Sequence, residues 1–145
     1  MHNVNLAALL ALLLLGATLP SPASANCTDT WFHGAWRSDA DKSVENFAFQ
    51  GIIVDVTRKE RLRNEIFGKL THVIDSRRFA VIFQMPDGEM RKVEDKLYRV
   101  VSCTSSSVTL GFPKSDWPDV TLYKTQGCYL HRVQNNFEHF CQQAQ

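Results

Sequence analysis

The feature that most constrains the fold is a run of short alternating segments between residues 70 and 133. Apolar and polar residues alternate in several of these segments, which is typical of half-buried strands. Turn signals separate them, and Pro86-Asp87-Gly88 is the strongest. Sequential strands with short connections favour a mainly β fold, an antiparallel up-and-down β-barrel. The expected strands are 70–75, 79–83, 90–103, 108–112, 120–124 and 128–133.

Two short helical stretches are expected before these strands. In residues 40–56, Val44, Phe47 and Ile52 keep helical spacing after a polar start. The β-branched run 52–56 also fits a strand, so a helix that turns into a strand stays open.

The second helical stretch has a clearer start. Thr57 and Glu60 form a capping box, and Gly68 stands where a helix-ending glycine belongs. Leu62 and Ile66 lie four residues apart on one face, so we expect both to be buried against the barrel. The residues expected to stay in water are Arg61 and Arg63.

The first 25 residues resemble an export signal. Residues 6–15 are nearly all Leu and Ala, a stretch too short to span a bilayer. Ala23-Ser24-Ala25 is a small-x-small cleavage site. We therefore predict a signal peptide at 1–25 and a single domain at 26–145, secreted or periplasmic, with no integral membrane segment after cleavage. The formal net charge of +1 argues against a dedicated nucleic-acid binder.

All four cysteines, Cys27, Cys103, Cys128 and Cys141, follow the expected cleavage site. An even count in an exported chain predicts two disulfides, with three possible connectivities. We expect Cys27 to pair with Cys141, tying the two ends together, and Cys103 to pair with Cys128. No Cys-x-x-Cys occurs, which argues against a redox motif or a zinc site.

The sequence carries no motif of an enzyme. It contains no Gly-x-Ser-x-Gly, no glycine-rich phosphate loop and no His-Glu-x-x-His. Paired cysteines would be unavailable as nucleophiles. We therefore predict a protein that is not an enzyme and has no cofactor and no metal. The histidines considered and declined as metal ligands are His33, His72, His131 and His139.

The stretch Gly34-Ala35-Trp36 opens the expected domain. Glycine permits a bend or a close approach, and the Trp36 indole carries a large apolar surface with one N–H donor. A Gly-x-Trp at the start of a β-rich chain indicates an indole that plugs one end of a barrel. An ordinary core tryptophan after a turn fits the same residues.

Several short motifs together resemble small exported bacterial domains of the lipocalin-like, calycin type. They are Gly34-Ala-Trp-Arg-Ser-Asp39, Gly68-Lys-Leu70, Asp87-Gly-Glu89, Tyr98-Arg-Val-Val101, Ser107-Val-Thr-Leu110 and Gly127-Cys-Tyr129. The resemblance implies a β-barrel in which a late arginine covers the Gly-x-Trp indole. Arg132 is the nearest match for that arginine, and Arg99 is the second.

The leading functional hypothesis is a non-enzymatic binding domain for a small apolar or amphipathic ligand inside the barrel. The same side chains would also serve simply to fill it. The alternative is a protein-binding module, such as an inhibitor or immunity protein for a cell-wall enzyme, acting through the loops at Trp117-Pro118 and Met85-Pro86. The expected ligand-binding residues are Phe47, Phe49, Phe79, Val81, Phe83, Leu110 and Phe112.

Overall fold

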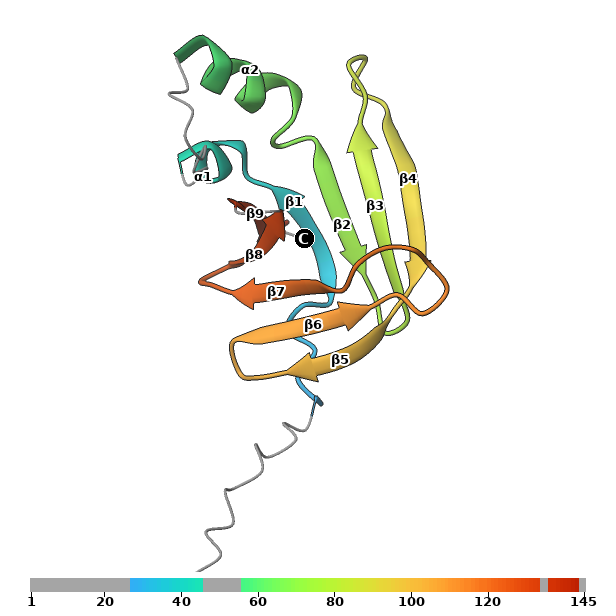
Figure 1. Ribbon diagram of the computed structural model, residues 1–145. Helices are drawn as coiled ribbons and strands as arrows, with labels where there is room; N and C mark the ends of the chain where they lie inside the picture. Colours follow the sequence, from blue (N-terminus) through green and yellow to red (C-terminus); the bar gives the residue numbers. More distant parts are fainter. Residues whose placement is uncertain (1–26, 46–55, 134–135, 144–145) are drawn as a thin grey trace, which may run out of the picture.

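The described part of the protein is a single curled antiparallel sheet of nine strands with two short helices at one end (Figure 1). A computed structural model describes residues 27–45, 56–133 and 136–143. The mainly β, barrel-like fold expected from the alternating segments is thereby confirmed. The strands are β1 (Gly34–Ser38), β2 (Leu70–Ile74), β3 (Arg78–Gln84), β4 (Met90–Leu97), β5 (Arg99–Cys103), β6 (Ser107–Gly111), β7 (Val120–Lys124), β8 (Cys128–Val133) and β9 (Asn136–Gln142).

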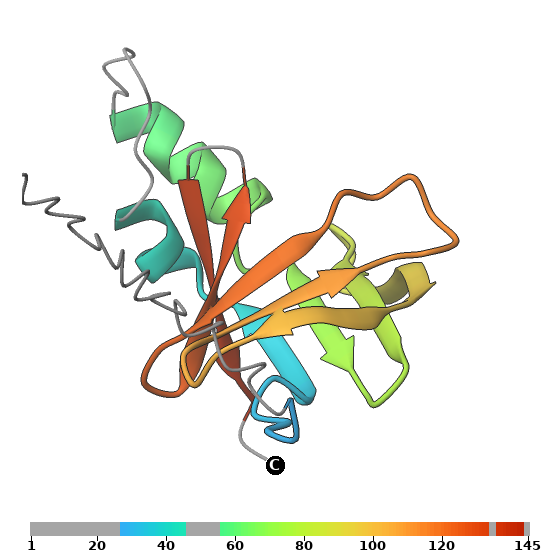
Figure 2. The ribbon, with the colours of Figure 1, turned by 60° about the horizontal axis from the view of Figure 1, so that its bottom comes forward.

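The spatial order of the strands is β4-β3-β2-β1-β9-β8-β7-β6-β5. Every strand except β4 and β5 therefore has two hydrogen-bonded neighbours in the sheet, and the first strand pairs with the last. β4 and β5 are consecutive in the chain but lie at opposite edges. The sheet thus curls into a half-barrel whose two edge strands, β4 and β5, are not hydrogen-bonded to each other. Figure 2 shows β5, β6 and β7 running at an angle to β1, β2 and β3.

The expected single strand over residues 90–103 is wrong for this reason. It divides at Tyr98, between β4 and β5. The Tyr98 hydroxyl donates to the Asp75 carbonyl and lies 3.0 Å from Nε2 of His33. These contacts tie the division point to the β2–β3 turn and to the segment before β1.

Local chemistry explains where the elements begin and end. The helix α1 (Ala40–Glu45) starts after Asp39, whose Oδ1 accepts the Lys42 N–H at 3.0 Å as an N-cap. In the β2–β3 turn, Oδ1 of Asp75 accepts two successive backbone N–H groups at 2.7 Å each. Gly88 in the β3–β4 turn has φ of +88°, a conformation that glycine adopts at no steric cost.

The helix α2 (Val56–Glu65) departs from the expected packing. It contains no fully buried residue, Leu62 is half-buried, and Ile66, just beyond its end, is 50% exposed. The predicted burial of Ile66 is wrong, because Phe67 is the side chain that turns inward. Arg61 is exposed as expected, whereas Nε of Arg63 lies 2.9 Å from Oδ1 of Asp41 and ties α2 to α1.

The core lies on the inner, concave face of the sheet. Alternate residues of each strand point inward, so one cluster draws on most strands. Trp36 is 4% exposed, its Nε1 donates to the Phe32 carbonyl at 2.8 Å, and its ring centroid lies 4.9 Å from that of Tyr129. The buried cluster comprises Phe32, Trp36, Ile74, Phe79, Val81, Val108, Leu110, Phe112, Leu122, Tyr129 and Phe140.

The burial expected for Trp36 is confirmed, but the arginine expected over its indole is not. Trp36 stands opposite Gln142 of β9, and Arg132 stands opposite Phe137 of the same strand. Gln142 and Phe137 are five residues apart along β9, which is roughly 17 Å at about 3.4 Å per residue. Arg132 is exposed, and Tyr129 contacts the indole in its place.

Both disulfides exist, but the expected connectivity is wrong. Cys27 pairs with Cys103, and Cys128 pairs with Cys141. Cys128 and Cys141 are direct partners in the β8–β9 register, whereas β6 and β7 separate the strands that carry Cys103 and Cys128. The first bond therefore fixes the segment before β1 to β5, and the second joins two neighbouring strands.

Some expectations lie outside the described residues. They are the signal peptide at 1–25, the helix-or-strand segment 46–55, and the ligand-binding residues Phe47 and Phe49.

The position of Trp36 predicts a large effect of its removal. Trp36→Ala should lower the free energy of unfolding by about 3–5 kcal/mol, because it removes a buried indole and leaves the Phe32 carbonyl without its donor. Urea titration followed by circular dichroism measures this. Val93→Ala, at a position 51% exposed, is the control and should stay within about 0.5 kcal/mol of the wild type. A similar small change for Trp36→Ala would contradict the assignment of the indole to the core.

Candidate functional site

The expected ligand-binding residues divide into two groups. Phe79, Val81, Leu110 and Phe112 are buried in the core cluster, where Phe79 and Phe112 contact each other edge to face at 5.8 Å. Phe83, at the end of β3, is only half-buried. The described part of the inner face is thus packed at the Phe79 end, and of the described members of the set Phe83 is the one that lines the surface hollow discussed next.

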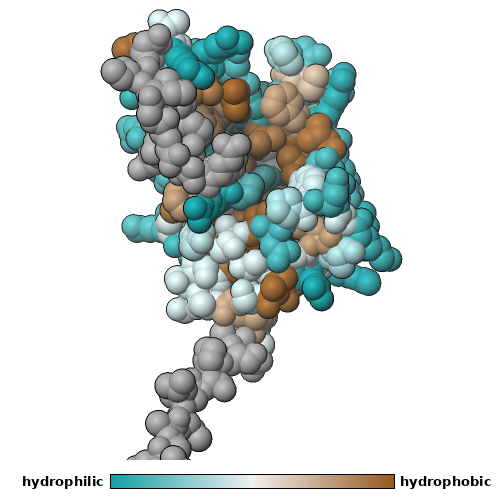
Figure 3. Space-filling view, viewed as in Figure 1, coloured by the Kyte–Doolittle hydropathy of each residue, from teal (hydrophilic) through white to brown (hydrophobic). Residues whose placement is uncertain are grey.

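That hollow lies between the end of α2 and the β3–β4 hairpin and has a volume of about 480 Å³. We call it the α2 groove. Figure 3 shows hydrophobic side chains between α2 and this hairpin on the face seen in Figure 1. The lining residues are Asn64, Glu65, Lys69, Phe83, Gln84 and Pro86.

The walls of the α2 groove are held by hydrogen bonds from β1. Arg37 donates through Nη2 to Oε1 of Gln84 at 2.6 Å and through Nε to the carbonyl of Gly68 at 3.2 Å. Gly68 has φ of +75°, and a Cβ there would lie 3.2 Å from that of Ala40. A glycine at this point lets the chain turn from α2 into β2 against α1. Phe83 and Pro86 supply the apolar part of the groove's lining, and Glu65 and Lys69 add one anionic and one cationic side chain.

A second feature of the inner face is a buried polar cluster next to the aromatic core. Nδ1 of His72 on β2 and Oη of Tyr129 on β8 are hydrogen-bonded at 2.7 Å. The His72 ring stacks on Phe140 at 3.9 Å and lies 5.6 Å from that of His131. Because β1 and β9 separate β2 from β8 in the sheet, these contacts exist only because the sheet curls.

The carboxyl of Glu138 is 6% exposed in the same cluster. It accepts the Ser38 hydroxyl at 2.6 Å, and Ser38 in turn accepts the N–H of Gly68 at 2.9 Å. Glu138 and His131 are direct partners across β8 and β9. This hydrogen-bonded chain joins the α2–β2 turn to the middle of the last strand pair.

Burial changes the protonation of the whole cluster. It lowers the pKa of His131 to about 4, and together with the nearby His131 it lowers the pKa of His72 well below the ordinary value. Burial also raises the pKa of Glu138, an effect that the Ser38 hydrogen bond partly offsets. The pKa of Tyr129 is raised by burial and then by Glu138. Both imidazoles are therefore neutral near pH 7.

Metal and membrane chemistry find no support in the described ranges 27–45, 56–133 and 136–143. Within them, no three His, Cys, Asp or Glu side chains are arranged to hold a metal ion. None of the helices described there combines the length and apolarity that a bilayer crossing needs.

The protein-binding alternative would need Trp117 to project from an exposed loop, but the structure packs its ring on the core. The Trp117 ring is half-buried and packs on Phe112 at 5.4 Å, with Nζ of Lys96 5.5 Å from its centroid. Pro118 and Pro86 are exposed, whereas Met85 is half-buried. The loop after β6 therefore packs the Trp117 indole on the core and leaves only part of it exposed.

Sequence reasoning missed the members of the buried polar cluster other than its histidines. Ser38 and Glu138 are 100 residues apart, and His72 and Tyr129 are 57 apart. No rule of sequence spacing predicts contacts between such distant positions, because only the register of the curled sheet brings them together. Glu138 alone among them carries a sequence signal, because it is an acidic residue between the aromatic residues Phe137 and Phe140.

Comparison of the chain with protein-family models, with curated proteins and with solved structures finds no match.

The buried histidines predict a loss of stability in mild acid. An imidazole whose folded pKa is about 4 takes up its proton near pH 6.5 only when unfolded, so stability falls as the pH drops from 6.5 towards 4. From pH 7.5 to pH 5, His131 should contribute about 2 kcal/mol of this loss. Glu138, whose pKa is raised, acts in the opposite direction as it becomes protonated.

The measurement is the difference in unfolding free energy between pH 7.5 and pH 5 for the wild type and for His131→Asn. The variant keeps a neutral polar side chain but cannot take up a proton, so its loss should be smaller by about 2 kcal/mol. His33 and His139 are common to both proteins, and His72 stays buried in both, so burial keeps its pKa low even though the smaller contribution of His131 is lost. Equal losses in the two proteins would show that His131 is not held neutral by burial.

Proposed function

We propose that this protein is an exported, non-enzymatic binding domain for a small amphipathic ligand held in the α2 groove. The observation that carries this proposal is the composition and size of the groove. A volume of about 480 Å³ lies within the range of about 300–1,000 Å³ usual for small-molecule sites. The ligand would lay an apolar portion on Phe83 and Pro86 and direct a polar group towards Lys69 or Glu65.

The loose docking of α2 supports this assignment. One wall of the groove belongs to a helix with no fully buried side chain, while the opposite wall belongs to β3, which is paired on both sides. Elements with few buried apolar contacts open at low free-energy cost. A small ligand would therefore enter by displacement of α2, without disruption of the sheet.

Export is proposed on the basis of the two disulfides. Cross-links of this kind persist in oxidising compartments such as the periplasm or the extracellular space. The apolar segment at 6–15 and the small-x-small site at 23–25 fit the same route. The buried polar cluster supports a structural role and not a catalytic one, since its hydrogen bonds are made within the chain.

The first test is native mass spectrometry of the protein purified from its own host. We expect a small molecule that stays bound to the native protein and is lost on denaturation, so the native mass should exceed the denatured mass by the mass of that molecule. The second test is titration with 8-anilinonaphthalene-1-sulfonate, an amphipathic anion. Phe83→Ala should weaken binding of this probe about tenfold, which is about 1.4 kcal/mol.

The matched control is Phe137→Ala, the same truncation at another half-buried phenylalanine. Phe137 lies on the outer face of the sheet, where it contacts Tyr123 at 5.8 Å. This variant should bind the probe as the wild type does, and near-ultraviolet circular dichroism of both variants shows that they are folded. An absence of retained ligand together with equal probe affinities in all three proteins would contradict the assignment of the α2 groove.

A further inference from the structure

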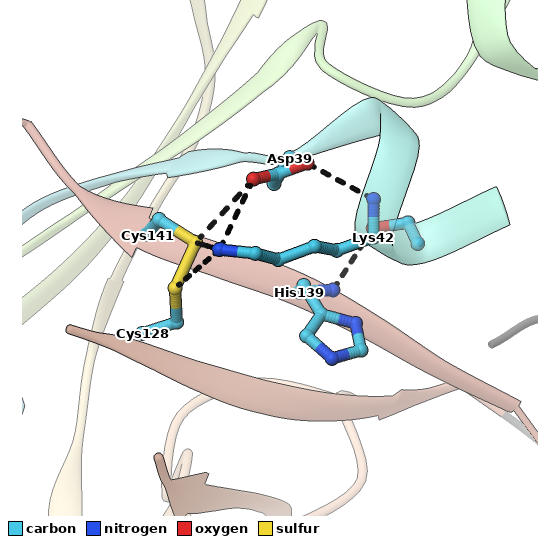
Figure 4. Close-up of polar contacts among 6 residues, drawn as sticks. Asp39, Lys42, Cys128, His139 and Cys141 are labelled. Carbon is cyan, nitrogen blue, oxygen red and sulfur yellow. Dashed lines mark hydrogen bonds and ion pairs between the residues drawn. A yellow bond between two sulfur atoms is a disulfide. The ribbon is translucent and has the colours of Figure 1, made fainter. Parts of the chain in front are cut away.

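A lysine, an aspartate and a disulfide meet on the outer side of β8 and β9 (Figure 4). The disulfide joins Cys128 to Cys141 across the two strands. Nζ of Lys42 in α1 lies 3.6 Å from Sγ of Cys128 and 3.7 Å from Sγ of Cys141. Oδ2 of Asp39 lies 3.8 Å from Sγ of Cys141 and 3.5 Å from the same Nζ.

Lys42 is held at this place by the fold of α1. Its backbone N–H is bonded to Oδ1 of Asp39 at 3.0 Å, and the next residue, Ser43, accepts the N–H of His139 on β9 at 2.9 Å. The Lys42 side chain is 52% exposed, so the ammonium group is open to water as well as close to sulfur. Of the two sulfur-bearing residues, Cys141 is half-buried and Cys128 is 5% exposed.

These positions match the needs of thiol–disulfide exchange. The attacking group is a thiolate, and the sulfur that leaves also departs as a thiolate. A nearby ammonium group favours the thiolate form of a cysteine and makes it a better leaving group. An external thiolate would reach Cys141, the more exposed partner, and Cys128 would then leave beside Lys42.

We propose that the Cys128–Cys141 disulfide is a reducible site that exchanges with an external dithiol, with Lys42 as the residue that promotes the exchange. This inference is independent of the α2 groove and its ligand. The sequence contains no Cys-x-x-Cys motif, which argued against a redox role. The β8–β9 register nevertheless brings together two cysteines that are 13 residues apart in the chain.

The exchange balances in two steps. One thiolate of the dithiol attacks Sγ of Cys141, the S–S bond breaks, and Cys128 leaves as a thiolate beside the Lys42 ammonium. The second thiol of the dithiol gives up its proton to solvent. The resulting thiolate attacks the other sulfur of the same dithiol, which is bonded to Cys141 in the mixed disulfide, and Cys141 is released as a thiolate. The protein gains two electrons, and the dithiol becomes a disulfide.

The reduced pair would find partners already in place. The Cys128 thiolate would keep the Lys42 ammonium, and the Cys141 thiol, once protonated, would donate to the carboxylate of Asp39. Both contacts need only the positions that Lys42 and Asp39 already occupy at 3.6 and 3.8 Å from the sulfurs. This arrangement lets the reduced form persist without a change in the path of α1.

The test follows the opening of each disulfide by dithiothreitol at pH 7.5. Samples are quenched with N-ethylmaleimide, and peptide mapping by mass spectrometry counts each pair separately. Lys42→Gln should slow the opening of Cys128–Cys141 by about three- to tenfold. The rate for Cys27–Cys103 in the same sample is the internal reference and should not change.

Two further variants separate charge from packing. Lys42→Arg keeps the cation and should retain a rate close to that of the wild type. Lys114→Gln, which removes an exposed lysine from the loop after β6, should have no effect on either bond. In the wild type, raising the salt concentration to about 1 M should lower the Cys128–Cys141 rate towards that of Lys42→Gln, because screening weakens the ammonium–thiolate attraction.

The proposal is overturned if Lys42→Gln opens Cys128–Cys141 as fast as the wild type does, or if Lys42→Arg is as slow as Lys42→Gln. A parallel slowing of both disulfides would also overturn it, since that result would reflect a change in the whole fold. If a Lys42 variant fails to fold, the wild type decides: a Cys128–Cys141 rate that does not fall relative to the Cys27–Cys103 rate at about 1 M salt would overturn the proposal.

Discussion

The hydrogen bond between His72 and Tyr129 is the contact on which the shape of the protein depends. It joins β2 to β8 across two intervening strands, which is possible only when the sheet is curled. The same curl brings Phe140 onto the His72 ring and Trp36 beside Tyr129, so the aromatic core and the polar cluster form together. A buried polar pair of this kind is costly when incomplete, and its satisfaction favours one curvature over flatter alternatives.

The two faces of the last strand pair then take different roles. Inward positions of β8 and β9 supply Tyr129, His131, Glu138 and Phe140, which stabilise the concave side. Outward positions supply Cys128 and Cys141, which α1 covers with Lys42. A strict alternation of side chains along each strand thus separates an internal hydrogen-bonded network from a charged, sulfur-bearing exterior on the opposite face of the same two strands.

Much of this fold could be predicted from the sequence, because many of its elements are determined by patterns of residues that are close together in the chain. The alternation after Leu70, the turn at Pro86-Asp87-Gly88 and the core position of Trp36 all depend on near neighbours in the chain. The predictions that proved wrong depend on the register between strands that are far apart in the chain. The division at Tyr98, the disulfide connectivity and the partner of the Trp36 indole are set by which strands become neighbours, and no residue pattern within one segment determines that. The α2 groove was foreseen only through Phe83, because its other walls come from a helix end and a hairpin.

The pairing of β1 with β9 has a consequence for how the chain reaches this state. Contacts such as Ser38 with Phe140 close a loop of about one hundred residues, so they carry a high entropic cost until the intervening strands are ordered. Local hairpins such as β2–β3 and β6–β7 close much shorter loops, so their entropic cost is lower. The order of events that follows is early formation of two separate strand groups and late closure of the seam between the first and last strands. Until β9 is available, one edge of β1 therefore has no strand to pair with.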